Sequence, residues 1–239
     1  VAFEGRLLAT DHGETFVRIS GPAEGAPLVL LPGGLSSSLV WRRLIEPLST
    51  RFRTYALDAI YDVGRSVPTR PVEGIADLTR WLDAVLDGLG LRDDAYLAGL
   101  SFGAYAAAEY ALHAPERVRR MVWLSPAMIV APMSPEFVAR ISATAVPGPE
   151  PLRAFTRWIM PGLASLNARQ LEERVKDQLL IRETYRAVMP PVGRAVFSDE
   201  DLRSIQMPVL YVVGEHDGAV EDPRAAFARV NTVAPGIET

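Results

Sequence analysis

Residues Gly99-Leu100-Ser101-Phe102-Gly103 form a Gly-x-Ser-x-Gly pattern at the junction of two contrasting segments. The apolar run Tyr96–Leu100 predicts a buried strand, and the alanine-rich stretch Phe102–His113 predicts a helix. A strand that turns directly into a helix lifts a serine hydroxyl above a sheet, and crowding at so sharp a turn admits only small residues two positions away. This context favours Ser101 as a nucleophile over a serine that merely caps the helix.

Strands and helices alternate along the rest of the core. Two β-rich segments, Phe3–Thr10 and Thr15–Ser20, predict a hairpin around a polar turn. Further strands are predicted at Pro27–Leu31, Arg53–Leu57, Val118–Leu124 and Val209–Val213, and helices at Val40–Leu48, Ile75–Leu89 and Ala225–Val233. The alternation predicts an α/β fold with a mostly parallel sheet and helices on both of its faces.

The pattern changes after Pro126, where about eighty residues carry helical periodicity and prolines but no convincing strand. We expect a helical cap over residues 127–206, inserted after the sixth strand, and a core made of residues 1–126 and 207–239. Leu152–Met160 and Leu171–Ile181 would supply helices of the cap. Four aromatic side chains are candidates for the lining of a pocket or, equally, for plain core, namely Phe102, Trp123, Phe155 and Trp158.

A serine nucleophile needs donors for the developing oxyanion and an acid behind its base. The backbone N–H of Phe102 lies at a predicted helix N-terminus, which favours negative charge. The second donor is expected in the loop after Leu31, at Gly34 or, one residue on, at Leu35; an ordinary turn is the alternative. Asp217 follows the last long strand and is the candidate acid, with Glu215 as the competing carboxylate and a solvated loop charge as the structural alternative.

The composition of the chain limits which partners, cellular location and cysteine chemistry we expect. The chain has 239 residues, 49% of them hydrophobic, which is enough for one globular unit with an inserted lobe. A net charge of −4 argues against nucleic acid and anionic membranes as partners. No apolar run is long enough to cross a bilayer and residues 1–6 do not resemble a signal peptide, so we expect a cytoplasmic location. The absence of cysteine excludes disulfides, thiolate zinc sites and cysteine nucleophiles.

Taken together, these motifs resemble the α/β-hydrolase family over nearly the whole chain. The resemblance rests on Leu30–Trp41, Tyr55–Asp58 with Gly64–Ser66, Ala98–Ala104 and Val213–Asp217. More narrowly, the sequence resembles bacterial carboxylesterase-like members with a helical cap.

The resemblance implies hydrolysis of a small-molecule ester or related acyl substrate, without a cofactor or metal. It assigns the nucleophile to Ser101, the oxyanion donors to Gly34 and Phe102, and the acid to Asp217. Pro32 stands where the family often has a histidine, but that histidine is structural and is not the base.

The histidines depart from the family pattern, in which the base follows the acid along the chain. No histidine follows Asp217. His12 in the hairpin turn, His113 in the last turn of its helix and His216 beside the acid are each better explained without a role as the base. We therefore expect the encoded protein to continue past Thr239 with a strand, a loop carrying the catalytic histidine and a closing helix, and a chain that stops there to be nearly inactive.

Two other functions fit the same pattern. The missing base favours a non-catalytic hydrolase-fold protein that binds a small apolar ligand between core and cap. A cofactor-free peroxidase, lyase or C–C bond hydrolase would use the same residues on other substrates. The sequence leaves the natural substrate and the oligomeric state open.

Overall fold

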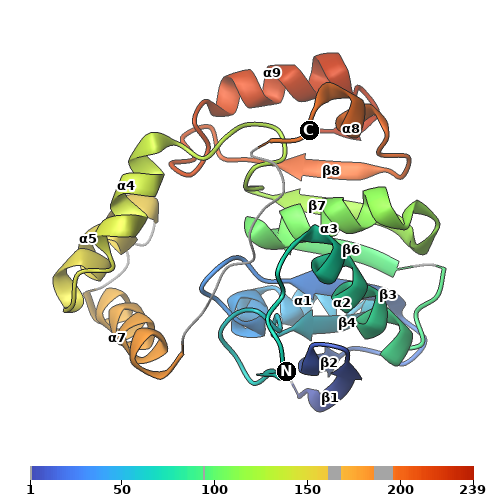
Figure 1. Cartoon of the computed structure of the whole chain (residues 1–239), viewed down its shortest axis with the longest axis horizontal. Coiled ribbons are helices and arrows are strands. Elements are labelled where there is room, and N and C mark those ends of the chain that lie inside the picture. The colour runs from blue at the N-terminus through green and yellow to red at the C-terminus, as the bar shows by residue number, and fades with distance from the viewer. Residues whose placement is uncertain (1, 94, 161–167, 186–195) are drawn as a thin grey trace.

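The sheet at the centre of the molecule carries the predicted strands in one layer (Figure 1). The computed structural model describes residues 2–93, 95–160, 168–185 and 196–239. Within them the sheet has the order β1-β2-β4-β3-β6-β7-β8-β9, with β5 paired to β2. The strands are β1 (Glu4–Thr10), β2 (Gly13–Ser20), β3 (Ala26–Leu31), β4 (Phe52–Leu57), β5 (Val67–Pro68), β6 (Ala95–Leu100), β7 (Val118–Leu124), β8 (Val209–Val212) and β9 (Ile237–Glu238).

Helices connect these strands. They are the 3₁₀ helix η1 (Ser38–Arg43), α1 (Ile45–Leu48), α2 (Ile75–Gly88), α3 (Phe102–His113), the 3₁₀ helix η2 (Pro115–Arg117), α4 (Pro135–Ala143), α5 (Pro149–Ile159), α7 (Ala168–Thr184), α8 (Asp199–Arg203) and α9 (Pro223–Val233). None of the helices in the described residues is long and apolar enough to span a membrane.

The strand directions agree with the predicted α/β fold. β1 and β2 form the predicted antiparallel hairpin, and β2 also pairs antiparallel with β4. From β4 through β3, β6, β7 and β8 to β9 every neighbouring pair is parallel. Parallel neighbours put their carboxyl ends at one edge of the sheet, where ligands of such folds bind. The loops that follow β3, β6, β7 and β8 therefore share one edge.

Strand β3 shows why the central strands are apolar throughout. Val29 and Leu31 pack into the larger core cluster, which contains residues of α2, α3 and α9. Leu28 and Leu30 point to the opposite face, where they pack with Trp41 of η1 and with residues of α1. A strand covered on both faces has no solvent side, so its sequence is a continuous apolar run rather than an alternation.

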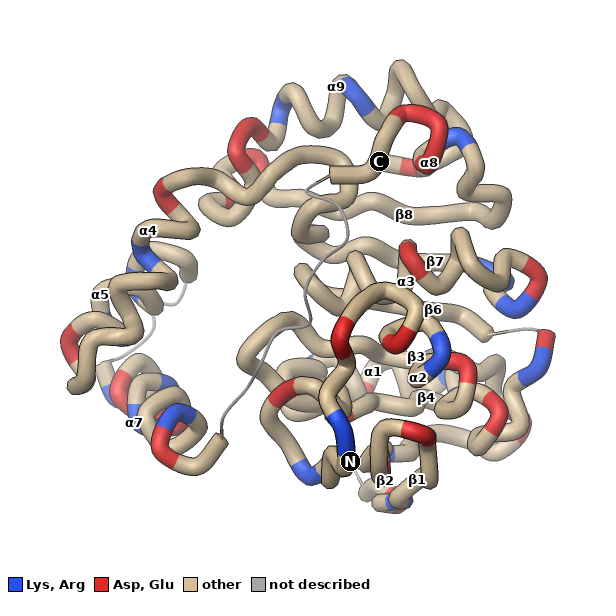
Figure 2. The backbone as a smooth tube through the Cα atoms, viewed as in Figure 1, with Lys and Arg blue, Asp and Glu red and all other residues tan. Residues whose placement is uncertain are grey.

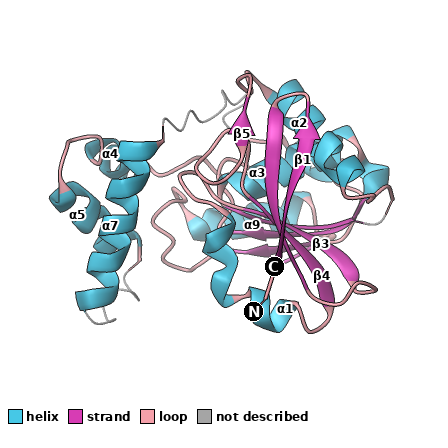
Figure 3. Ribbon diagram, turned by 90° about the horizontal axis from the view of Figure 1, so that it is seen from below, coloured by secondary structure: helices cyan, strands magenta, loops and turns pink. Residues whose placement is uncertain are grey.

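Three helices between β7 and β8 stand apart from the sheet (Figures 1 and 3). The segments predicted as helices of this region lie in α5, which ends one residue before Met160, and in α7, and α4 precedes both. Leu152, Leu171 and Val175 form their shared apolar cluster, and the Arg153 guanidinium donates to both carboxylate oxygens of Glu172 at 2.7 Å. Residues 161–167 and 186–195 of the predicted cap lie outside the described residues.

The two-residue strand β5 was not predicted, and it places these helices after the seventh strand rather than the sixth. β5 pairs only with Gly13 and Glu14, and a strand of that length has no periodicity to detect. At the other end of the sheet, β9 pairs parallel with β8.

A buried hydrogen bond fastens α2 to the hairpin and gives a test of this packing. Trp81 Nε1 donates to Thr15 Oγ1 at 2.8 Å, and both side chains are fully buried. Thr15→Val keeps the shape but leaves the indole N–H without an acceptor, so we expect the free energy of unfolding to fall by about 1–3 kcal/mol. Urea denaturation measures this change, with the exposed Thr232→Val as the control. An unchanged midpoint in Thr15→Val would show that this bond does not stabilise the fold.

Candidate active site

Ser101 occupies the strained turn that the sequence predicts. It joins β6 directly to α3 with φ 52° and ψ −115°, a conformation that non-glycine residues rarely adopt. A Cβ on Gly99 would overlap the backbone of Ala104, and one on Gly103 would overlap the carbonyl groups of Leu31 and Pro32. Both flanking glycines are therefore required by close backbone approach.

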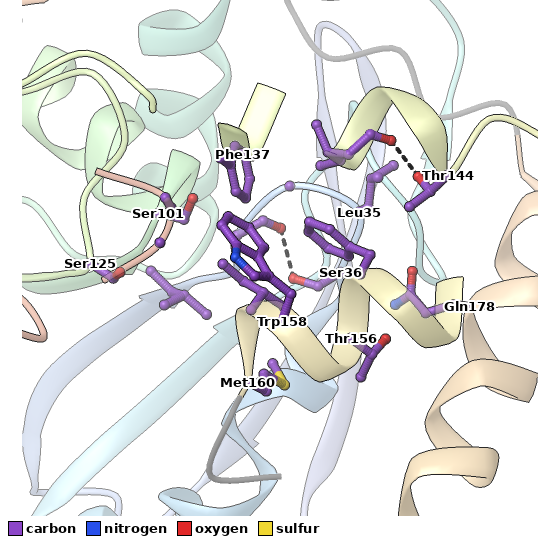
Figure 4. Close-up of a pocket in the computed structure, with 18 of the residues that line it drawn as sticks. Leu35, Ser36, Ser101, Ser125, Phe137, Thr144, Thr156, Trp158, Met160 and Gln178 are labelled. Carbon is purple, nitrogen blue, oxygen red and sulfur yellow. Dashed lines mark hydrogen bonds between the residues drawn. The ribbon is translucent and has the colours of Figure 1, made fainter. Parts of the chain in front are cut away.

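Ser101 lines a cavity of about 570 Å³ beneath α4, α5 and α7 (Figure 4). Gly34, Ser125 and Asp217 line the same cavity from the loops that follow β3, β7 and β8. The carboxyl edge of the sheet thus brings the candidate nucleophile, oxyanion loop and acid to one place. Phe102, the other predicted oxyanion donor, is the first residue of α3 and directly follows Ser101, and its side chain does not line the cavity.

Of the four aromatic side chains predicted as possible lining, two line the cavity and two do not. Phe155 and Trp158 lie on α5 and face the cavity together with Phe137 of α4. Phe102 and Trp123 are instead core residues, 3% and 0% exposed. Both belong to the larger core cluster.

The hydrogen bonds of the loop after β3, the candidate oxyanion loop, differ between the two predicted donors. The Leu35 N–H donates to Asp62 Oδ2 at 2.7 Å and is therefore already engaged. The Gly34 N–H donates to no other residue in the described part of the chain. Gly33 packs directly on the serine turn, where its Cβ would lie 3.3 Å from the Leu100 carbonyl oxygen. These contacts favour Gly34 over Leu35.

Two aspartates that follow β4 hold this loop. Asp58 accepts the Ser38 N–H at 2.8 Å and the Arg65 N–H at 2.8 Å. Asp62 accepts the N–H groups of Leu35 and Val63, each at 2.7 Å. Asp58 belonged to the family motif, but the role of Asp62 was missed because its partner is 27 residues away in the chain.

Asp62 has a strongly perturbed acidity. Burial raises the pKa of Asp62 to about 6, and the N–H groups of Val63, Leu35 and Ser36 limit that rise because they stabilise the carboxylate. A loop next to the candidate nucleophile is therefore held by a carboxylate that gains its proton in mildly acidic solution.

Asp217 is the better placed of the two candidate acids. Its Oδ2 accepts a hydrogen bond from the Ser125 hydroxyl, and its Oδ1 accepts the Ala219 N–H at 2.9 Å. Glu215 does not line the cavity, and its exposed carboxylate pairs with the exposed Arg224. Ser125 was not predicted as a site residue, although its position directly after β7, next to the serine strand, could have indicated it.

The three histidines lie in different surroundings. His12 is buried in the hairpin turn, where burial lowers its pKa and Arg70 lies 3.3 Å away. His113 ends α3, as predicted. His216 is exposed and lines the cavity beside Asp217. No group of three or more His, Cys, Asp or Glu side chains in the described ranges could hold a metal ion.

Comparison with known proteins identifies the family. The model of the alpha/beta hydrolase fold family matches residues 26–150, more than half of the chain. The chain belongs to the α/β-hydrolase family. It is 35% identical over 237 residues to carboxylesterase YbfK of Bacillus subtilis, an alignment that covers 98% of this chain and 78% of the relative.

Solved structures of carboxylesterases are also similar to this chain. The crystal structure of that Bacillus subtilis carboxylesterase, CesB (YbfK), superposes with a TM-score of 0.87 at 34% identity, over 100% of this chain and 82% of the other. The naproxen esterase (carboxylesterase NP) of Bacillus subtilis gives a TM-score of 0.88 at 31% identity, over 100% and 82%. This α/β hydrolase is therefore carboxylesterase-like, as the resemblance implied.

The raised pKa of Asp62 predicts a pH-dependent contribution to stability. A carboxyl whose pKa is higher in the folded chain than its ordinary 3.8 binds its proton more tightly when folded. The contribution of the Asp62 carboxyl to the free energy of unfolding is fully present below pH 3.8 and is lost as pH rises through 6. Between pH 4 and 7 we expect the stability of the unsubstituted protein to fall relative to Asp62→Asn by at most about 3 kcal/mol.

Urea denaturation across this pH range measures the difference. The exposed Asp177→Asn is the control and should run parallel to the unsubstituted protein. If the Asp62→Asn curve also ran parallel, Asp62 would not be titrating in the folded state near pH 6.

Proposed function

We propose that the protein hydrolyses small-molecule carboxylic esters by a serine mechanism, with Ser101 as nucleophile and Asp217 as the acid of the triad. The observation that carries this proposal is the positive φ of Ser101 at a cavity that Gly34 and Asp217 also line. The similarity to proteins named carboxylesterases supports the substrate class.

The proposed reaction has two halves. Ser101 Oγ attacks the ester carbonyl carbon while a histidine takes its proton, and the carbonyl oxygen becomes the oxyanion. The N–H groups of Gly34 and Phe102 stabilise that charge. The C–O bond to the alcohol then breaks as the imidazolium returns the proton to the leaving oxygen. Water hydrolyses the acyl-enzyme by the same steps and releases the acid.

Asp217 acts through that histidine. In the proposal its carboxylate accepts the imidazole Nδ1–H, which fixes the tautomer and stabilises the imidazolium. The hydrogen bonds from Ser125 and Ala219 hold the carboxylate in position while it does so. The family order implies a histidine that comes after the acid, so the proposed base is not His216.

The same proposal assigns residues 127–206 to a cap that selects the substrate. Phe137, Phe155 and Trp158 form an aromatic cluster with ring centroids 5.9–6.4 Å apart, and all three line the cavity. Such a surface favours esters with apolar or flat groups.

The nucleophile assignment predicts that Ser101→Ala loses at least about a thousandfold in kcat, because a triad acts as one unit. Initial rates on 4-nitrophenyl butyrate measure this in the protein as its gene encodes it. Ser142→Ala, an exposed serine on α4, is the matched control and should keep full activity. Unchanged hydrolysis by pure Ser101→Ala would favour the non-catalytic binding protein instead.

Three neighbouring residues test the acid and the base together. We expect Asp217→Asn to lower kcat at least about a hundredfold, since the amide cannot hold the reactive histidine tautomer. Glu215→Gln and His216→Gln should stay within about threefold on the same ester. A large loss in Glu215→Gln would move the acid to Glu215. A loss in His216→Gln equal to that of Ser101→Ala would make His216 the base.

A further inference from the structure

Arg174 is a cation in the wall of the cavity that the proposed mechanism does not use. It lies on α7, is half-buried, and lines the cavity together with Gln178 and Arg182. These residues are spaced by four along the helix, so they share one face of it. α7 therefore turns a polar stripe toward a cavity whose α5 side carries Phe155 and Trp158.

Several charged residues of α7 have hydrogen-bonded partners, whereas Arg174 forms no hydrogen bond or ion pair with a described residue. Glu172 is held by Arg153, and Arg169 pairs with Glu173 at 2.8 Å. Arg182 donates to the carbonyl and hydroxyl oxygens of Thr144. Figure 2 shows acidic and basic residues side by side along the helix. An arginine without an ion pair in such surroundings can still bind an anion through its guanidinium group.

The groups around Arg174 increase that capacity. Burial lowers the pKa of Arg174, as do the nearby charges of Arg42 and Arg43, while Asp177 opposes them. Arginine stays protonated in spite of such a shift, so the charge persists and is poorly solvated. A bound carboxylate would replace the lost water and offset the repulsion from η1.

The order of the strands shows on which side of Ser101 the charge of Arg174 lies. Arg42 and Arg43 belong to η1, which follows β3, and Asp217 follows β8. Ser101 follows β6, which lies between β3 and β8 in the sheet. The charges of Arg42 and Arg43 act on Arg174, and the hydroxyl of Tyr185, the residue after α7, donates to the Gly64 carbonyl in the loop that follows β4 at 2.6 Å. Arg174 therefore lies on the β3–β4 side of Ser101, opposite Asp217.

We propose that Arg174 binds a carboxylate on the acyl part of the substrate, so that the preferred substrates are monoesters of dicarboxylic acids. This inference rests on the proposed ester hydrolysis. The leaving alcohol receives its proton from the imidazole that Asp217 orients, so the alcohol departs on the β8 side. The acyl chain then extends toward the β3 side, where the planar guanidinium can hold a carboxylate through two parallel hydrogen bonds.

The test compares two esters that differ in one charge, monoethyl adipate and diethyl adipate. In Arg174→Gln we expect the ratio of their kcat/KM values to fall at least about tenfold, mainly through KM, which corresponds to about 1.4 kcal/mol. Arg174→Lys should keep part of the preference. Arg169→Gln removes the same charge from the outer face of the same helix and should leave the ratio within about twofold.

Two further measurements separate the inference from the proposed function. Calorimetric binding of monoethyl adipate to Ser101→Ala should weaken at least about tenfold when Arg174→Gln is added, and it needs no catalysis. An ester with its carboxylate on the alcohol side, 4-acetoxybutanoate, should show no dependence on Arg174.

The outcomes are distinct. An unchanged ratio, or an equal loss on both adipate esters, would overturn the inference and leave the esterase proposal standing. Dependence of 4-acetoxybutanoate alone would overturn the assignment to the acyl side. Hydrolysis of neither adipate ester, with Arg174-dependent binding intact, would instead count against the proposed function and support the subsite.

Discussion

The close approach of α3 to the end of β3 is the constraint on which the site depends. Gly103 has no room for a Cβ because the carbonyl groups of Leu31 and Pro32 lie against it, and Gly99 is equally confined by Ala104. This contact forces Ser101 into its positive-φ turn and sets the loop after β3 directly beside it. Any larger residue would push the helix away from the sheet and separate the serine from the Gly34 N–H.

The loop of Asp217 is joined to the helices above the cavity as well as to the sheet. Ser134, the N-cap of α4, donates its hydroxyl to the Gly218 carbonyl at 2.6 Å and its N–H to the Ala219 carbonyl at 2.9 Å. A Cβ on Gly218 would meet the Trp158 ring at 2.9 Å. The loop of Asp217 and the aromatic wall of the cavity therefore pack directly against each other.

Buried charges order the opposite side of the cavity. Asp58 and Asp62 hold the oxyanion loop through backbone N–H groups, which costs desolvation but fixes the loop without competing for the Gly34 N–H. Arg174 is the complementary case, since it is desolvated and forms no ion pair with a described residue, and Asp177 only partly offsets that cost. A binding site can retain a desolvated, unpaired charge when the substrate supplies the opposite charge.

The sequence by itself determined the parallel sheet, the helices of α5 and α7 and the turn at Ser101, because apolar runs, helical spacing and paired glycines are local signals. It also indicated Gly34 and Asp217, since they lie in loops that follow strands. Only the tertiary structure favours Gly34 over Leu35 as the candidate donor, because the acceptor that engages the Leu35 N–H, Asp62, comes from another loop. The same holds for Ser125, Phe102, Trp123 and Arg174: whether such a side chain faces the cavity, the core or an ion-pair partner depends on contacts between segments far apart in the chain, which no local pattern encodes.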